Sequence, residues 1–323
     1  MKFLRRQFLH LAAGALGAPT LSRIVWAESY PTRPVHFVVG FPAGTAPDIL
    51  ARLVGQWLSE QLGQQFIIDN RPGASSNIAT EFVAKAAPDG YTLLMAVSSN
   101  AVNAALYTKL NFDFVRDVAP VAYFAGNPFV LVATPSLPVK TLPEFIAYAK
   151  ANPGKLNMAS QGVGTTPHVC GELLKLMTGI DFTHVPYRGP LMPDLLAGQV
   201  QFYFSPMPQP IEYVRDGRLR ALGVTTATRS DVLPDVPAIG EFVPGYEASG
   251  WLGLVTPKGT PTEIIDKLNN AVNVIVANPN NKARLGRLGE KPMPMTPAEF
   301  GKFMDAEIGK WGNVIRFAAI KPE

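Results

Sequence analysis

Three polar segments of the chain each follow an apolar run and precede residues at helical spacing. They are Phe41–Asp48, Ser98–Asn100 and Ser160–Thr166. Backbone N–H groups at a helix start lack a partner within the helix, and the positive end of the helix dipole lies there, so such positions attract anions. Glycine lets a carboxylate approach the backbone, and Ser, Thr and Asn add neutral donors. Because the segments lack paired lysines, the pattern favours a carboxylate held by neutral hydrogen bonds. The alternative is that they are only capped helix starts and turns.

Catalysis finds little support in the residue types. The chain has no Gly-x-Ser-x-Gly elbow. His36 lies within an apolar run, so we expect it to be a satisfied core histidine. His168 stands beside the third segment and either borders the ligand or makes a hydrogen bond behind it. Asp48 is expected to cap a helix, which leaves a hydrolase or lyase using Asp48 or His168 as the enzyme alternative.

Cofactor and metal sites are also disfavoured. Gly162 and Gly164 suggest a dinucleotide fingerprint, but Pro167 takes the place of the third glycine. No acidic residue stands about 20 residues further on at the end of a second strand, where a ribose would need it. The single cysteine, Cys170, forbids an internal disulfide and has no Cys or His neighbour at metal spacing, so we expect a buried, inert thiol. Arg188 either faces an anionic ligand or forms an exposed ion pair.

The elements that position these segments alternate between strand and helix. Val35–Val39 is predicted to be a buried strand, followed by a helix that Thr45 caps, that Asp48 closes with a capping box and that Gly63 ends. Further strands are predicted at Phe66–Ile68, Thr92–Val97, Phe129–Ala133, Leu156–Ala159, Thr183–Val185, Val200–Phe204, Leu219–Thr225 and Trp251–Val255. Further helices are predicted at Ile78–Ala87, Leu142–Ala151, Pro167–Met177, Pro261–Val276 and Pro297–Phe317.

This order predicts two α/β domains, each a mostly parallel sheet flanked by helices. Domain 1 is expected to comprise residues 28–125 and 249–323, and domain 2 residues 126–248. Ligands in such folds bind at the carboxyl ends of the strands, so facing strand-end loops would form a cleft between the domains.

The basic balance of the chain belongs to its leader. The chain has 29 Lys+Arg and 25 Asp+Glu, and four of the basic residues but no acidic ones lie in residues 1–27. The remainder is neutral, which does not support nucleic-acid binding. A basic start with Arg5 and Arg6, a short apolar run and a small residue at Ala27 predict an export signal over residues 1–27, of the twin-arginine type. An ordinary Sec signal is the alternative. No later stretch reaches about 20 apolar residues, so we expect a periplasmic protein that does not span the membrane.

Residues 30–321 resemble the Bug solute receptors of tripartite tricarboxylate transporters along nearly their whole length. The tracts that carry the resemblance stand in the family's order and spacing. They are Tyr30–Pro31, Val35–Pro42, Asn70–Ala74, Ala86–Leu93, Pro153–Leu156, His184–Gly189, Leu219–Leu222, Leu233–Pro237, Gly259–Pro261 and Lys310–Trp311.

The resemblance implies a periplasmic-binding-protein-like fold, no catalysis, no cofactor and a carboxylate held by backbone amides, hydroxyls and ordered waters. Carried onto the matching positions, it implies a binding site composed of Pro42, Ala43, Gly44, Thr45, Asp48, Ser160, Gly162, Gly164, Thr165 and Thr166, with Ser98, Asn100 and Tyr187 as neighbours. There are departures from the family pattern. Thr45 stands for the second glycine of the first loop, and Ser75–Ser76 follow Ala74 where a glycine is common. Ser205 replaces a common aspartate, which argues against an amino-acid ligand and places Ser205 at the site.

The sequence therefore predicts an exported, monomeric solute-binding protein for a small mono- or dicarboxylate, aromatic ones included. It would close by hinge motion and transiently contact the membrane subunits of a transporter. A sensory receptor of the same fold remains an alternative that the sequence does not separate from a transport role.

Overall fold

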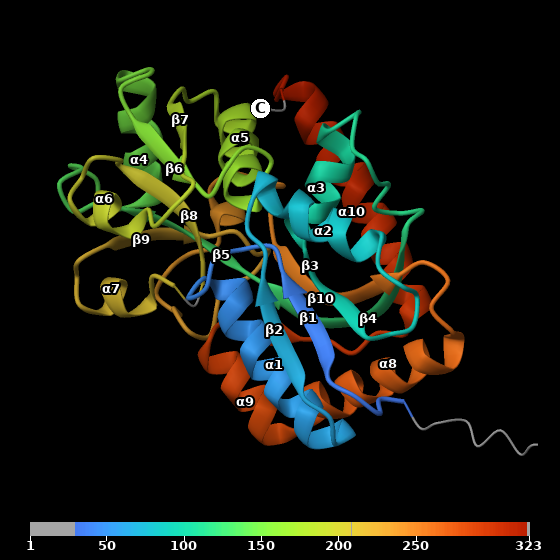
Figure 1. The fold of residues 1–323 in the computed structure, drawn as a ribbon. Helices are drawn as coiled ribbons and strands as arrows, with labels where there is room; N and C mark the ends of the chain where they lie inside the picture. Colours follow the sequence, from blue (N-terminus) through green and yellow to red (C-terminus); the bar gives the residue numbers. More distant parts are fainter. Residues whose placement is uncertain (1–29, 208, 322–323) are drawn as a thin grey trace, which may run out of the picture.

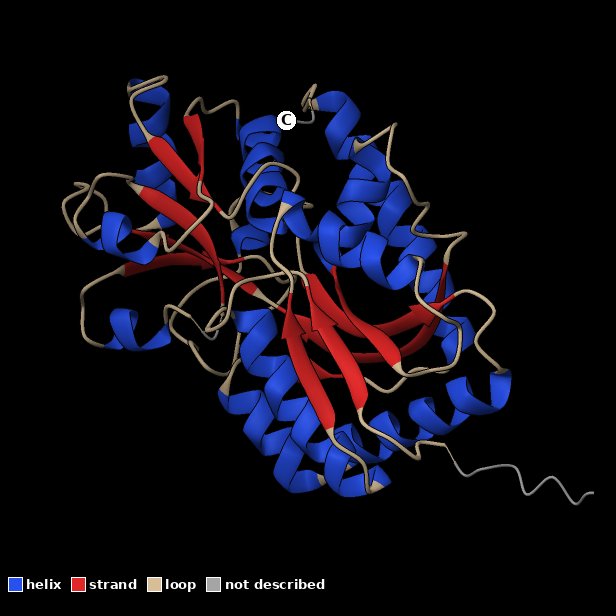
Figure 2. Ribbon diagram, in the orientation of Figure 1, coloured by secondary structure: helices blue, strands red, loops and turns tan. Residues whose placement is uncertain are grey.

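A computed structural model of the chain describes residues 30–207 and 209–321, which fold into two β-sheets flanked by helices (Figure 1). The predicted export signal over residues 1–27 lies outside the described residues. Helices flank both sheets (Figure 2). The predicted two-sheet α/β architecture is confirmed.

The first sheet has the strand order β11-β4-β10-β3-β1-β2. Strands β1 and β2 are parallel, as are β1 and β3, whereas β10 and β11 pair antiparallel with their neighbours. The strands of this sheet are β1 (Val35–Val39), β2 (Phe66–Asn70), β3 (Thr92–Val97), β4 (Val118–Asn127), β10 (Gly250–Pro257) and β11 (Lys291–Pro292).

The second sheet has the order β7-β6-β8-β5-β9. Strands β7, β6 and β8 are mutually parallel, and β5 pairs antiparallel with β8 and β9. The strands of this sheet are β5 (Phe129–Ala133), β6 (Asn157–Ser160), β7 (Thr183–Pro186), β8 (Phe202–Pro206) and β9 (Arg220–Val224).

The two sheets repeat one topology. The order β4-β10-β3-β1-β2 in the first sheet corresponds to β9-β5-β8-β6-β7 in the second. Each sheet has three parallel strands beside an antiparallel strand, β10 or β5, which the chain enters as it crosses from the other sheet. The antiparallel strands β10 and β5 make both sheets mixed, which corrects the prediction of mostly parallel sheets. The parallel trios, β3-β1-β2 and β8-β6-β7, are the parts that the strand–helix alternation describes.

The helices cover both faces of each sheet. In the first sheet α1 and α8 pack on one face, and α2, α3 and α10 on the other. In the second sheet α4 and α5 share a core with Phe202 and Phe204, while α6 and α7 pack near Tyr203. The helices are α1 (Ala46–Leu62), α2 (Asn77–Ala84), α3 (Ser98–Leu106), α4 (Leu142–Ala151), α5 (Thr166–Thr178), α6 (Met192–Leu196), α7 (Ile211–Arg215), α8 (Thr262–Ala277), α9 (Pro279–Arg287) and α10 (Pro297–Phe317), with short 3₁₀ turns η1 (Ala74–Ser76) and η2 (Ile239–Glu241).

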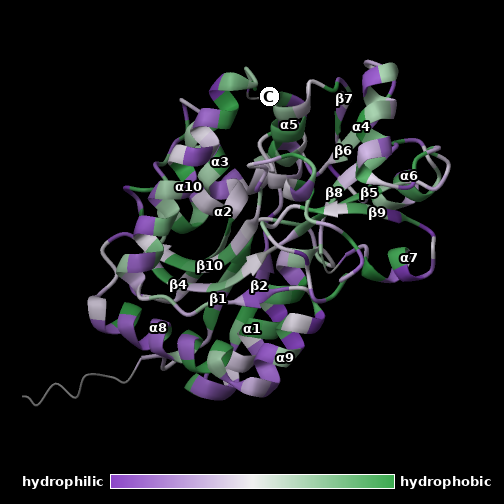
Figure 3. Cartoon of the chain, turned by 180° about the vertical axis from the view of Figure 1, so that it is seen from behind, coloured by the Kyte–Doolittle hydropathy of each residue, from purple (hydrophilic) through white to green (hydrophobic). Residues whose placement is uncertain are grey.

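The burial pattern follows from this layering. Seen from behind, the central strands are largely hydrophobic, and the outer turns of α8 and α9 are largely hydrophilic (Figure 3). Cys170 is buried in α5, as predicted, and burial raises the pKa of its thiol. His36 is exposed in β1, so its prediction as a core histidine is wrong: it occupies the one outward-facing position of that strand. Among the described helices, none combines the length and apolar character that crossing a bilayer requires.

The chain passes between the sheets at two adjacent places. Pro128 alone separates β4 from β5, and the return follows Ala248. Thr225 holds the two passages together, because its Oγ1 accepts the Phe129 N–H at 3.0 Å and its carbonyl accepts the Ala248 N–H at 3.0 Å. The first sheet keeps β4 as far as Asn127, two residues beyond the predicted boundary at 125; the division into domains itself stays a prediction.

Candidate functional site

The predicted binding segments lie at the carboxyl ends of the parallel strands. In each sheet the central parallel strand, β1 or β6, has neighbours on both sides that follow it in the chain. The crevice outside the carboxyl end of such a strand is where ligands bind in open α/β sheets. The loop Phe41–Thr45 leaves β1 there, and the loop Gln161–Thr165 leaves β6.

The loop after β1 is held by a short local network. Gly44 has φ +81°, a left-handed conformation that favours glycine. Thr45 is the N-cap residue of α1, but its Oγ1 donates to the Pro42 carbonyl at 2.7 Å. Asp48 accepts the N–H of Gly44 at 2.8 Å. The capping box expected between Thr45 and Asp48 is therefore wrong in its partners, because Asp48 reaches the residue before the cap.

Asp48 is a fixed ion in this network. Its carboxylate, which is 3% exposed, lies 2.9 Å from Arg52 Nη2 and accepts Asn70 Nδ2 at 2.9 Å. Burial of the carboxyl acts to raise its pKa, but the hydrogen bonds from Arg52, Gly44 and Asn70 outweigh burial and lower it. Its oxygens are engaged by the protein, so Asp48 shapes the loop and is not placed to act as a general base.

The loop after β6 repeats this geometry. Gly164 has φ +77°, and Thr165 is the N-cap of α5. Thr165 Oγ1 donates to the Gly162 carbonyl at 2.7 Å, and the Gly164 N–H donates to His168 Nδ1 at 3.2 Å. His168 therefore occupies the place in α5 that Asp48 occupies in α1.

Two buried histidine rings stand behind this second loop. The rings of His168 and His184 are stacked, with centroids 3.8 Å apart and planes 9° from parallel. Burial, with His184 as the second cause, lowers the pKa of His168 to about 3, and burial lowers that of His184 to about 4. His184 Nε2 lies 2.6 Å from Ser160 Oγ, which also accepts the Gly162 N–H at 3.1 Å. Both imidazoles are thus neutral at pH 7 and brace the loop.

Several backbone donors of the two loops remain open. Within residues 30–207 and 209–321, the structure gives no acceptor to the N–H groups of Ala43 and Ala46 in the first loop, or to those of Gln161, Val163 and His168 in the second. Ala46 and His168 lie in the first turns of α1 and α5, and the other three amides lie in the loops that lead into these helices. Such amides can hold a carboxylate without a cationic side chain.

The two halves of the molecule touch beside the second loop. Ser98 Oγ, at the first residue of α3, lies 2.6 Å from Thr166 Oγ1 at the first residue of α5. The Thr166 N–H donates to Ser99 Oγ at 3.2 Å. All three side chains are buried. The predicted loop Ser98–Asn100 is instead the first turn of α3, and it meets the second loop directly.

A segment outside the predicted site residues makes a further contact between the halves. Ser75 Oγ donates to the Val163 carbonyl at 2.7 Å. Ala74, Ser75 and Ser76 have φ of 45°, 52° and 80°, in the left-handed region that non-glycine residues rarely adopt. Strain of this kind collects at functional sites. The detectable signal was the replacement of a common glycine by serine in this tract.

The remaining predicted residues have varied surroundings. Asn100 is occupied internally, since its Oδ1 accepts the Val97 N–H at 2.7 Å and its Nδ2 donates to Thr80 at 2.8 Å. Ser205 is fully buried near the carboxyl end of β8. Tyr187 donates to Asp194 at 2.8 Å and so turns toward α6. Arg188 is exposed, and no carboxylate of a described residue forms an ion pair with it.

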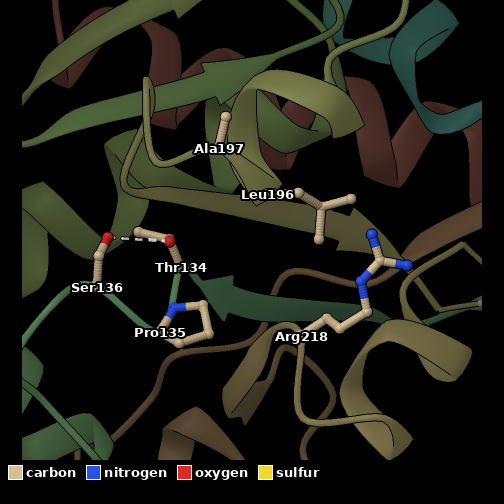
Figure 4. A pocket seen from close by; sticks show the side chains of 6 residues that line it. All are labelled: Thr134, Pro135, Ser136, Leu196, Ala197 and Arg218. Atoms are coloured by element: carbon tan, nitrogen blue, oxygen red, sulfur yellow. Dashed lines mark hydrogen bonds between the residues drawn. The ribbon is translucent and has the colours of Figure 1, made fainter.

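Two surface pockets lie away from these loops. A pocket of about 320 Å³ lies just past the end of β5, where Thr134, Ser136 and Arg218 line it (Figure 4). A second, of about 450 Å³, lies between α1 and α9 and is lined by Arg52 and Arg287 among others. Neither has the convergent helix N-termini of the loops. The contacts of Ser98 with Thr166 and of Ser75 with Val163 bring the two halves together beside the second loop.

Comparison with known proteins places this geometry in a family. The family model described as "Tripartite tricarboxylate transporter family receptor" matches residues 50–320. Rpa4515 of R. palustris, solved with adipate, is 38% identical with a TM-score of 0.88, over 91% of this chain and 100% of that chain. The periplasmic binding protein BugD is 29% identical with a TM-score of 0.86, over 91% and 100%. MatC of Rhodopseudomonas palustris, solved with malate, is 33% identical with a TM-score of 0.83, over 88% and 100%.

Proposed function

The chain belongs to the tripartite tricarboxylate transporter receptor family, and we propose that it is a periplasmic solute-binding receptor for a small carboxylate. The observation that carries the proposal is the meeting of the α3 and α5 N-termini, joined by Ser98 and Thr166, beside loops whose amides are open. The ligands of the similar structures, adipate and malate, support a dicarboxylate.

Binding would use the predicted residues in two ways. The open amides of the two loops would contact the ligand directly or through water, together with the one proton of the Ser98–Thr166 hydroxyl pair that this pair leaves free. Thr165 would hold its loop in place, because its hydroxyl already donates to the Gly162 carbonyl. Asp48 and Asn100 would hold their loops in place, because their own polar atoms are already engaged. Separation of the two halves would admit the ligand, and their closure around it would present one surface to the transporter's membrane subunits. Export would follow the twin-arginine route.

An enzymatic role has no support from the two residues that it would need. Asp48 is paired with Arg52, and His168 is buried with its Nδ1 engaged by the Gly164 N–H. The family match is to receptors.

The proposal is tested by thermal unfolding and calorimetry on protein purified from the periplasm, with adipate, malate and benzoate as ligands. Adipamide is the matched control, since it keeps the shape of adipate and removes both charges. At one hundred times its Kd a ligand stabilises the folded state by about 2.7 kcal/mol, which corresponds to roughly 5–10 °C in Tm at the few degrees per kcal/mol typical of larger domains. We expect a rise with at least one carboxylate, none with adipamide, and recovery of the ligand unchanged. Equal shifts with adipate and adipamide, or no shift across a wide carboxylate panel, would contradict the proposal.

A further inference from the structure

The two binding loops are copies of one local structure, residue by residue. Gly44–Asp48 has the sequence Gly-Thr-Ala-Pro-Asp, and Gly164–His168 has Gly-Thr-Thr-Pro-His. In both, the glycine has φ near 80° and the threonine is the N-cap with extended backbone. In both, the threonine hydroxyl donates at 2.7 Å to the carbonyl three residues earlier. The third residue of the helix then accepts the glycine N–H.

The copies differ in charge at that third residue. Asp48 is an anion, and it is balanced by Arg52 one turn further along α1. His168, which is neutral, is followed one turn further by Glu172, so in α5 the acidic residue stands at the second of the two positions. The first loop therefore holds a fixed negative charge close to its open amides, and the second loop holds none at the equivalent place.

We infer that His168 is the specificity-determining residue that makes the loop at α5 the one that receives the ligand's carboxylate. It holds the Gly164 N–H as Asp48 holds that of Gly44, but it does so with an uncharged acceptor. The amides of Gln161, Val163 and His168, which have no acceptor among the described residues, would then be open to a carboxylate with no anion at the place that Asp48 holds in the first loop. The loop at α1 would meet a part of the ligand that is not repelled by Asp48. This inference rests on the proposed function.

The surroundings of His168 keep it in the neutral form. Its Nδ1 accepts a hydrogen bond, so the ring proton is on Nε2, which lies 3.8 Å from Glu172 Oε1. The parallel ring of His184, with its centroid 3.8 Å away, disfavours a positive charge on His168, and the His168 side chain is 6% exposed. Burial raises the pKa of Glu172, which weakens the carboxylate that could otherwise draw a proton onto the imidazole.

The test uses calorimetric titration with adipate and three variants. His168→Asn places a neutral oxygen where Nδ1 stands and should bind adipate within about threefold of wild type. His168→Asp, alone and with Glu172→Arg, transplants the α1 arrangement. Two unit charges about 6 Å apart at an effective dielectric of about 20 correspond to roughly a hundredfold weaker binding for the single variant, and the added arginine should leave at least a tenfold loss. Met177→Asp adds the same charge about 14 Å away on α5 and should stay within twofold, given a screening length of about 8 Å.

The outcomes separate the inference from the proposed function. If wild type binds no carboxylate, the proposed function and the inference both fail. If wild type binds and the Asp-Arg variant binds equally well, the inference alone is overturned. It is also overturned if His168→Asn loses as much affinity as His168→Asp. Unliganded Tm values identify any misfolded variant, and the Asn variant then decides by itself whether a neutral acceptor suffices.

Discussion

Ser75 offers a sharp test of how the two halves of the molecule are held closed. Its hydroxyl donates to the Val163 carbonyl across the site, while its backbone sits at φ 52° and ψ 42°. Two substitutions separate these features. Ser75→Ala removes the hydrogen bond and keeps the left-handed strain, and Ser75→Gly removes both.

The magnitudes follow from the two contributions. A hydrogen bond of this kind is worth about 1 kcal/mol, which is roughly a fivefold change in an equilibrium constant. A left-handed conformation costs a non-glycine residue about 1–2 kcal/mol relative to glycine, part of which the freer unfolded chain of glycine offsets. We expect both variants to bind ligand about fivefold more weakly. We expect Ser75→Gly to be more stable than Ser75→Ala by about 0.5–1 kcal/mol.

Urea unfolding measures the stability difference, and calorimetric titration with a carboxylate that raises Tm measures affinity. The reasoning requires the two variants to agree in affinity and to differ in stability. Wild-type affinity in Ser75→Ala would show that the hydrogen bond from Ser75 to Val163 does not contribute to ligand binding. Equal stability of the alanine and glycine variants would show that the left-handed backbone at this position costs no stability.

Three further predictions concern the same loops. Gly164→Ala should weaken ligand binding at least about tenfold, with a smaller effect on the stability of the unliganded protein. The added Cβ would lie 2.8 Å from Leu106 Cδ2 and 2.9 Å from Asn103 Oδ1 on α3. Calorimetric titration together with Tm measurements tests this, and unchanged affinity would contradict the close packing of α3 against the second loop. The pKa of His168 is lowered to about 3 and that of His184 to about 4, against about 6.5 for an unfolded imidazole. The unfolded chain therefore binds more protons in this range, so stability present above pH 6.5 should be lost as the pH falls toward 4; urea midpoints should show this, and His168→Asn should flatten the slope. Cys170 should resist a thiol reagent in the folded protein and react after denaturation, because it is buried. Rapid labelling of the native protein would contradict this burial.

The sequence predicted those parts of the fold in which local pattern and tertiary structure agree. The bounds of β1, β3, β5, α4 and α10 match the predicted ones. Gly63 ends α1 in a left-handed conformation, as a glycine there predicts. These segments combine a regular spacing of apolar residues with a residue that ends the element, so the local sequence is sufficient to predict their bounds.

Other elements depend on partners that no local pattern reveals. Strand β4 contains Pro120, which normally argues against a strand. It is tolerated because the ladder with β10 is irregular there, between Val255 paired with Pro120 and Leu254 paired with Ala122. The first turn of α3 resembles a polar loop in the sequence, and only the bond from Val97 to Asn100 shows how it is capped.

The candidate site divides in the same way. The helix-start chemistry of both loops was visible in their glycines and threonines. The partner of Asp48 was not, because Asn70 comes from the next strand and reaches Asp48 only in the folded protein. The stacking of His168 on His184 likewise joins a helix to a strand, and neither histidine showed this pairing in the sequence.

The most direct test of the central claim is a crystal structure of the protein with a carboxylate that raises its Tm. We predict that one carboxylate of the ligand lies within about 3 Å of open amides among Gln161, Val163 and His168, between that loop and the first turn of α1. A ligand seated in the groove between α1 and α9, or on any surface away from the two loops, would contradict this account.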